Sequence, residues 1–158
     1  MGSRIYFDTC IISGIAKNDL ARDEMQALFK IIQSPYFLCT SEVSKDEIEK
    51  IPKQFRIEHS RVYELLLKLN TLPIVQPSML MLMGVGGGGV DPLFAVLKEI
   101  PLGDKDAEHL FQALKNNVDK FITTDQKTIL KHSSKILEKT GLMVYSPVQY
   151  AEVLDKEV

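Results

Sequence analysis

Short apolar runs that favour β-strands alternate with longer stretches of helical periodicity along most of this 158-residue chain. The short runs are rich in β-branched and aromatic residues, whereas the longer stretches repeat apolar residues every three or four positions. Strands that are separated by helices pair in parallel, because the chain must return to the same end of the sheet between them. The sequence therefore predicts an α/β fold whose mostly parallel sheet carries helices on both faces.

The bounds of these elements follow from the apolar periodicity and from breaking residues. The expected strands are Arg4–Asp8, Tyr36–Thr40, Leu72–Val75, Lys120–Thr123 and Leu142–Tyr145. The expected helices are Asp23–Ile32, Ser44–Ile51, Phe55–Leu69, Asp104–Asn116 and Lys127–Lys139, the last of them ended by Gly141. A further helix is expected after Ser146-Pro147, because serine caps free amides and proline suits the first helical position.

Length and composition place the chain among ordinary globular domains. It is 45% hydrophobic and 25% charged, which is typical of a soluble protein, and 158 residues suit a single domain over residues 1–158. No apolar run approaches the roughly 20 residues that span a bilayer, and the first residues lack the pattern of a signal peptide. We therefore expect a cytoplasmic protein with no membrane partner.

The net charge gives no clear indication of a partner. Lys and Arg total 19 against 21 Asp and Glu, so the chain lacks the strong basic excess of many nucleic-acid binders. Cations bound by a few of the carboxylates would reverse the sign of this small difference. Net charge therefore neither supports nor excludes a nucleic-acid substrate.

A glycine tract, "GVGGGGV" at residues 84–90, has the letters of a dinucleotide-binding fingerprint. That motif requires a strand immediately before it, a helix that opens within it and an acidic residue about 20 positions later. None of these accompanies the tract, and no Gly-Lys-Ser/Thr closes it as a phosphate-binding loop. We interpret residues 84–91 as a flexible glycine-rich loop.

Two aspartates follow directly on strand-type runs. Asp8 ends "RIYFD", and Asp125 comes just after Phe121-Ile122-Thr123-Thr124. A buried lone carboxylate is costly unless a partner compensates its charge, and ligands of open parallel sheets bind outside the carboxyl ends of the strands. We expect both aspartates at that edge of the sheet, on neighbouring strands.

A glutamate occupies a position where the helical pattern predicts an apolar residue. Glu47 lies one turn after Val43 and one turn before Ile51, on the apolar stripe of its helix. Taken alone, it reads more simply as a glutamate at the helix rim whose long side chain reaches water. Together with the strand-end aspartates it becomes a candidate site residue.

The start of the Asp104–Asn116 helix holds two aspartates with different expected roles. Asp104 follows Gly103 and is well placed to cap the helix, whereas Asp106 lies in the first turn in line with Leu110 on the packed side. We assign Asp104 to capping and Asp106 to the site. His109, one turn after Asp106, is expected to be a surface or rim residue that could approach the same cleft.

Four carboxylates brought together in this way would repel one another. Hard divalent cations such as Mg²⁺ or Mn²⁺ relieve that repulsion, because they take oxygen ligands and keep open water positions for a phosphate. The expected metal ligands are Asp8, Glu47, Asp106 and Asp125. No well-placed Ser/His/Asp set or His pair is visible, so bound cations would carry the chemistry.

The motifs "YFDTC", "SKDEIEKI", "DKDAEHLFQAL" and "FITTDQKTI" carry these acids, and in this order and spacing the chain resembles PIN-domain ribonucleases, including VapC-type toxins. The resemblance runs from Arg4 to Leu154. It implies a three-layer α/β/α sandwich and an endonuclease that needs Mg²⁺ or Mn²⁺ and acts on RNA. Asp8, Glu47, Asp106 and Asp125 match the acidic centre. Thr123 matches the hydroxyl residue two positions before the last acid and would orient that acid by a hydrogen bond.

The function expected on this basis is metal-dependent cleavage of single-stranded RNA, as the toxin of a toxin–antitoxin pair. The expected partners are the RNA, an antitoxin protein and a second copy of the chain in a homodimer. One alternative is a PIN fold that binds RNA or a protein without cutting, which a missing acid would favour, and none is missing. Another is a phosphatase with Asp8 as nucleophile. That enzyme would need a second aspartate two residues later, where this chain has Cys10.

Overall fold

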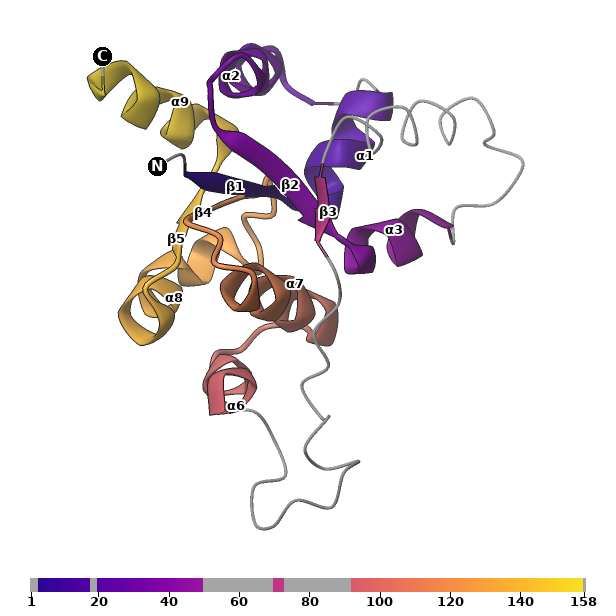
Figure 1. Ribbon diagram of the computed structural model, residues 1–158, viewed down its shortest axis with the longest axis vertical. Coiled ribbons are helices and arrows are strands. Elements are labelled where there is room, and N and C mark those ends of the chain that lie inside the picture. The colour runs from indigo at the N-terminus through magenta and orange to yellow at the C-terminus, as the bar shows by residue number, and fades with distance from the viewer. Residues whose placement is uncertain (1–2, 18–19, 50–69, 73–91, 158) are drawn as a thin grey trace.

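A computed structural model describes residues 3–17, 20–49, 70–72 and 92–157 (Figure 1). Its strands are β1 (Arg4–Phe7), β2 (Phe37–Ser41), β3 (Asn70–Leu72), β4 (Lys120–Ile122) and β5 (Met143–Tyr145). Its helices are α1 (Thr9–Lys17), α2 (Arg22–Ile32), α3 (Glu42–Glu49), α6 (Pro92–Lys98), α7 (Asp104–Lys115), α8 (Ser133–Thr140) and α9 (Pro147–Lys156). A short 3₁₀ helix, η2, spans Leu130–His132.

The described strands form one sheet in the order β3-β2-β1-β4-β5, and every neighbouring pair is parallel. Strand β1 lies at the centre, where Tyr6 is opposite Cys39 of β2 and Phe121 of β4. The chain moves outward from β1 to β2 and β3 and then returns to place β4 on the other side of β1. The parallel sheet expected from the sequence is confirmed.

Helices cover both faces of this sheet, as Figure 1 shows. Side chains of a strand alternate between the faces, so Ile5 and Phe7 pack in one core with α1, α2 and α9. Tyr6 lies between them and faces the opposite core, which α6, α7 and α8 complete. The result is the three-layer α/β/α sandwich that the family resemblance implied.

Two helices of the structure were not predicted from the apolar pattern. Helix α1 begins directly after Asp8, and its run of β-branched residues favours strands when read locally. Its Gly14 packs closely against Leu20, since an added Cβ would lie 2.5 Å from Leu20 Cδ2. Helix α6 begins at Pro92, a residue that suits the first position of a helix.

The helix expected over Lys127–Lys139 begins later than predicted. After β4 the backbone turns around Asp125, whose carbonyl oxygen accepts a hydrogen bond from the Leu130 amide at 3.0 Å. Its side-chain Oδ1 accepts another from the Thr128 amide at 3.1 Å. These contacts hold residues 126–129 in turns, so regular α-helix starts only at Ser133.

The predicted boundaries near the C-terminus are confirmed. Gly141 ends α8 in the left-handed conformation, with φ of +79°. Ser146 then opens α9 with a capping box, in which its Oγ accepts from the Gln149 amide at 3.2 Å. The Gln149 side chain accepts in return from the Ser146 amide at 3.0 Å.

Some sequence-based expectations fall on residues outside the described ranges. These are the helix Phe55–Leu69, residues 73–75 of the third expected strand and the glycine-rich loop at 84–91. Strand β3 ends at Leu72, the residue where that expected strand begins. Among the residues described, no helix has the length and apolar character needed to cross a membrane.

Candidate active site

The candidate site lies at the carboxyl edge of the two central strands. Asp8 directly follows β1, and Asp125 follows β4 after two threonines. The two strands are neighbours, and the Asp8 amide donates to the Ile122 carbonyl of β4 at 3.0 Å. The chain departs from β1 to one side of the sheet and returns as β4 on the other, so the two aspartates flank its topological switch point.

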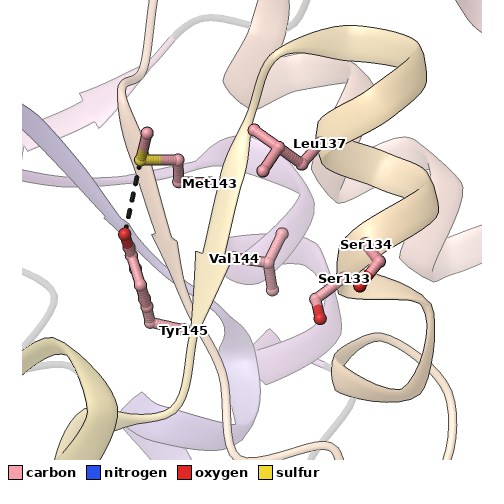
Figure 2. A pocket seen from close by; sticks show the side chains of 6 residues that line it. All are labelled: Ser133, Ser134, Leu137, Met143, Val144 and Tyr145. Atoms are coloured by element: carbon pink, nitrogen blue, oxygen red, sulfur yellow. Dashed lines mark hydrogen bonds between the residues drawn. The ribbon is translucent and has the colours of Figure 1, made fainter.

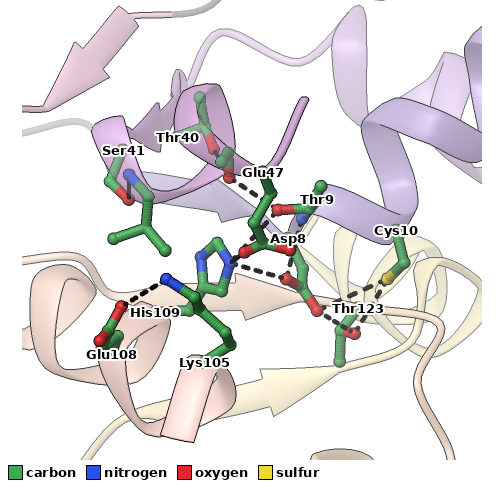
Figure 3. A network of polar contacts seen from close by, with 12 residues as sticks. Asp8, Thr9, Cys10, Thr40, Ser41, Glu47, Lys105, Glu108, His109 and Thr123 are labelled. Atoms are coloured by element: carbon green, nitrogen blue, oxygen red, sulfur yellow. Dashed lines mark hydrogen bonds and ion pairs between the residues drawn. The ribbon is translucent and has the colours of Figure 1, made fainter. Parts of the chain in front are cut away.

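The Asp8 carboxylate is buried, with 6% of the residue exposed, and it is well supplied with donors. Its Oδ1 accepts from the Thr9 amide at 2.8 Å, and its Oδ2 accepts from the Thr123 hydroxyl at 2.8 Å. The Cys10 thiol donates to Oδ2 from 3.5 Å (Figure 3). Donors from α1 and from the end of β4 therefore compensate the buried charge.

Thr123 joins the two strand-end acids. It is completely buried, donates its proton to Asp8 and accepts from the Asp125 amide at 3.1 Å. The expected hydrogen bond between Thr123 and Asp125 therefore involves the Asp125 backbone amide, which donates to the Thr123 hydroxyl, and not the Asp125 carboxylate. The Thr123 hydroxyl itself donates to the carboxylate of Asp8.

Cys10 lies against the same hydroxyl, 3.3 Å from Thr123 Oγ1. Burial and the negative charge of Asp8 raise the pKa of this thiol to about 11. It therefore remains protonated at neutral pH and serves the site as a hydrogen-bond donor. A thiol in this state is a poor nucleophile.

Glu47 extends from α3 toward Asp8 and His109, as Figure 3 shows. Its Oε1 lies 2.5 Å from His109 Nε2, and 29% of its side chain is exposed. Burial acts to raise its pKa, but the hydrogen bond and charge of His109 outweigh this effect, so the pKa of Glu47 is lowered. Glu47 therefore faces the candidate site and is not a solvated rim residue.

His109 is the residue whose position differs most from the sequence-based expectation. Only 2% of its surface is exposed, so it is neither a surface nor a rim residue. Its Nε2 also lies 3.2 Å from Thr9 Oγ1 and 3.7 Å from Asp8 Oδ1, and its Nδ1 lies 2.6 Å from the Tyr6 hydroxyl. Burial acts to lower the pKa of His109. The hydrogen bond to Glu47 and the surrounding negative charges prevail and raise it.

Asp106 is half-buried in the first turn of α7 and belongs to the same acidic group. Burial raises its pKa, and the negative charges of Asp8 and Asp125 raise it further. A carboxylate perturbed by its neighbours in this way is typical of functional sites. Asp106 thus lies in the first turn of its helix, and its role as a metal ligand stays a prediction.

The expectation that Asp104 caps α7 is wrong. The N-cap is Gly103, and no side chain caps this end of the helix. Asp104 is the first helical residue and is exposed, and its carboxylate pairs with Lys98 of α6. The hydrogen bond and charge of Lys98 lower its pKa. Helix α6 was not predicted, so this competing partner could not be foreseen.

The side chains of the candidate site are of the type that binds a hard cation. Asp8, Asp106 and Asp125 offer carboxylate oxygens, the ligands that Mg²⁺ and Mn²⁺ prefer, and the charges of the other two act on Asp106. In the described part of the chain, Thr128 lies in the turn after Asp125, and its side chain acts to lower the pKa of Asp106. Within that same part, no group of three or more His, Cys, Asp or Glu side chains is arranged so that it could hold a metal ion. A cation would relieve the repulsion that Asp106 experiences.

A separate surface pocket lies between α8 and β5 (Figure 2). It has a volume of about 160 Å³ and is lined by Ser133, Ser134, Leu137, Met143, Val144 and Tyr145. The Tyr145 hydroxyl donates to Met143 Sδ at 3.3 Å on its rim. None of the acids discussed above lines it, so it does not belong to the candidate site.

Sequence reasoning missed the polar residues that surround the acids. Tyr6, Thr9 and Ser44 contact His109 or one another, and each comes from an element next to a predicted acid. One signal was available, since His109 follows Asp106 by one turn and directly precedes the apolar residues Leu110 and Phe111. A polar residue on a packed face needs a partner, and only the fold shows which one.

Comparisons with known proteins locate the likeness at the level of structure. No family model and no curated protein matches the sequence. The DNA-bound VapBC2 structure from Rickettsia felis matches with a TM-score of 0.61 at 13% identity, over 90% of this chain and 98% of that one. The DNA-bound VapBC structure from Salmonella typhimurium matches with a TM-score of 0.59 at 14% identity, over 92% of this chain and 98% of that one. At these identities the likeness establishes the fold, and it confirms the PIN-like architecture.

Proposed function

We propose that this chain, which has the fold of a VapC-like PIN domain, is an endoribonuclease that uses Mg²⁺ or Mn²⁺ to cleave single-stranded RNA. The observation that supports the proposal is that Asp8 and Asp125 follow the neighbouring strands β1 and β4 at the switch point of the sheet. Asp106 lies in the first turn of α7, and burial together with the negative charges of Asp8 and Asp125 raises its pKa. The switch point is where open α/β sheets bind their ligands.

In this proposal the four acids hold the cation, and the surrounding residues hold the acids. Asp8, Asp106 and Asp125 supply oxygen ligands from three elements, while Glu47 approaches from α3. When bound, Mg²⁺ or Mn²⁺ activates water and neutralises charge on the phosphoryl oxygens. Thr123 fixes the orientation of Asp8 and the backbone of Asp125, so it is a positioning residue.

Single-stranded RNA is the proposed substrate because its bases can be splayed out and read, whereas an RNA duplex hides most base edges. The similar solved structures are VapBC complexes bound to DNA, and VapB and VapC are found together there. By analogy with those complexes, we propose an antitoxin protein as the partner of this chain and a homodimer as its own assembly. A cytoplasmic location is proposed on the same basis.

A cleavage assay on a mixed pool of single-stranded RNA tests the reaction. We expect endonucleolytic products that EDTA abolishes and that added Mg²⁺ or Mn²⁺ restores. Asp8→Asn and Asp125→Asn proteins that remain folded should lose this activity. Asp104→Asn is the matched control, because Asp104 is exposed and pairs with Lys98 outside the site.

Two results would contradict the proposal. Cleavage that survives both Asp8→Asn and Asp125→Asn would come from another site or another nuclease. Tight RNA binding without cleavage of any pool would support the alternative, a PIN fold that binds RNA without cutting it. In either case the Asp104→Asn protein shows whether the loss of one negative charge near α7 matters by itself.

Cation binding can be measured apart from cleavage. Because a ligand that binds only the folded state stabilises it, Mn²⁺ at about 100 times its Kd should add about 2.7 kcal/mol to the free energy of unfolding. For a domain of this size that raises the melting temperature by about 5–10 °C. EDTA should reverse the rise, and Asp125→Asn should reduce it.

A further inference from the structure

We propose, on the basis of the function above, that His109 is a positioning residue that fixes the Glu47 carboxylate in the acidic site. Nothing in the motifs that carry the four acids requires a histidine at this position. Its role is inferred from the contacts that join it to one strand, β1, and to two helices, α1 and α3. The consequence is that Glu47 contributes to cation binding only while His109 holds it.

His109 and Glu47 are joined by a short and direct contact. His109 Nε2 lies 2.5 Å from Glu47 Oε1, closer than its approach of 3.2 Å to Thr9 Oγ1 and of 3.7 Å to Asp8 Oδ1. A carboxylate accepts hydrogen bonds and does not donate them, so the proton of this contact is on Nε2. Glu47 is thus the main acceptor of this N–H.

The other ring nitrogen fixes the orientation of the imidazole. Nδ1 lies 2.6 Å from the Tyr6 hydroxyl, which in turn lies 2.6 Å from Ser41 Oγ. In the neutral ring with the proton on Nε2, Nδ1 accepts from Tyr6, and Ser41 can donate to Tyr6. A continuous chain of hydrogen bonds then runs from Ser41 of β2 through Tyr6 and His109 to Glu47.

Tyr6 is a rigid anchor for this chain. It is completely buried at the centre of the sheet and stacks on Phe121 of β4, with ring centroids 5.0 Å apart and planes inclined by 10°. The edge of the His109 ring packs against it at 5.8 Å and 74°. The position of His109 is therefore set by the core and not by solvent.

Glu47 needs such a restraint more than the other acids do. Asp8 is held by three donors and Asp125 by its own turn, whereas Glu47 has a longer side chain that is 29% exposed. His109 belongs to α7, one turn after Asp106, and Glu47 belongs to α3. Their contact therefore fixes the distance between the acid of α3 and the acid of α7.

The experiment measures Mn²⁺ affinity through the electron paramagnetic resonance signal of free Mn²⁺. The proteins are the wild type, His109→Leu, Glu47→Gln and the double variant. Because partners that orient ligands typically contribute 10- to 100-fold to metal affinity, we expect His109→Leu to weaken Mn²⁺ binding about tenfold. In the Glu47→Gln background the same substitution should cause no further loss, since the acid that His109 orients is gone.

His132→Leu is the matched control, because this half-buried histidine in η2 makes no side-chain hydrogen bond recorded in the described structure. It should bind Mn²⁺ as the wild type does. His109→Gln should recover part of the affinity, because an amide can donate to Glu47 and accept from Tyr6. If His109→Leu does not fold, Tyr6→Phe takes its place, and its loss of Mn²⁺ affinity should again require Glu47.

The possible results separate this inference from the proposed function. Wild-type protein without Mn²⁺ binding would overturn both. Wild-type binding that His109→Leu leaves unchanged, or independent and additive losses from His109→Leu and Glu47→Gln, would overturn the positioning role alone. In the cleavage assay, we expect His109→Leu to lower kcat while the KM for RNA stays unchanged. A merely structural defect would instead lower the amount of active protein and would be equally large in the Glu47→Gln background.

Discussion

The hydroxyl group of Thr123 donates a hydrogen bond of 2.8 Å to Oδ2 of Asp8 and so joins the ends of β4 and β1. Both residues are buried, and the acceptor is a carboxylate. Hydrogen bonds to charged groups contribute more to stability than neutral ones do, and a buried carboxylate that loses a donor keeps its desolvation cost. The contact therefore links the stability of the fold to the geometry of the site.

Thr123→Val tests this link, because valine keeps the volume of threonine and removes the donor. We expect the free energy of unfolding to fall by about 2 kcal/mol, measured by urea denaturation of the metal-free protein. Thr123→Ser retains the hydroxyl and loses a methyl group, so it should preserve the Mn²⁺-induced rise in melting temperature that Thr123→Val reduces. Equal Mn²⁺ responses in the two variants would show that the hydrogen bond to Asp8 is irrelevant to cation binding.

Asp106→Asn should stabilise the metal-free protein at neutral pH. Burial and the charges of Asp8 and Asp125 raise the pKa of Asp106 above its ordinary value of 3.8. The folded state therefore holds this proton more tightly than the unfolded state, and stability falls as pH rises through the folded pKa. Asparagine carries no charge and escapes that loss.

The comparison is made by urea unfolding at pH 7 and at a pH below 3.8. The gain from Asp106→Asn should appear at pH 7 and vanish at the lower pH. Asp104→Asn, in the same helical turn, should give no gain, because the pKa of Asp104 is lowered by Lys98. Equal gains from the two substitutions would mean that Asp106 experiences only the general negative charge of the helix start.

The His109–Glu47 pair should make stability depend on pH in a defined window. The raised pKa of His109 gives a contribution that is complete below its ordinary value of 6.5 and is lost as pH rises through the folded pKa. The lowered pKa of Glu47 gives one that is complete above 4.5 and is lost as pH falls through its folded pKa. The stability difference between wild type and Glu47→Gln should therefore be largest between pH 4.5 and 6.5.

Nuclear magnetic resonance titration of the imidazole signals checks the same pair directly. In metal-free protein, His109 should titrate above 6.5, and Glu47→Gln should lower its pKa. A His109 pKa that is the same in both proteins would show that Glu47 does not interact with the imidazole in solution.

Ser146→Ala should destabilise the protein through the start of α9. The substitution removes the side-chain acceptor of the capping box, a loss of about 1 kcal/mol, or about 2–4 °C in melting temperature. Ser134→Ala is the control, since Ser134 is an exposed residue inside α8 and an exposed surface change of this kind is nearly neutral. Thermal denaturation followed by circular dichroism measures both.

The features that the sequence alone determined are those encoded by neighbouring residues. An apolar strand-type run followed by an acid placed Asp8 and Asp125 at the carboxyl edge of parallel strands, and Ser146-Pro147 specified the start of α9. Helical spacing likewise put Glu47 and Asp106 on faces that turn toward the interior. Each of these follows from the period of one element, which a short stretch of chain expresses by itself.

The roles that only the tertiary structure decided depend on which elements pack together. Asp104 does not cap α7, because the unpredicted helix α6 brings Lys98 to it, and the start of α8 shifts because the backbone turns around Asp125. His109 becomes a buried residue with polar partners on both sides only because β1 places Tyr6, and α3 places Glu47, against its two ring nitrogens. A buried polar side chain takes the partner that the fold supplies, and Tyr6, the partner of His109, lies 103 residues away along the chain, so no local pattern contains it.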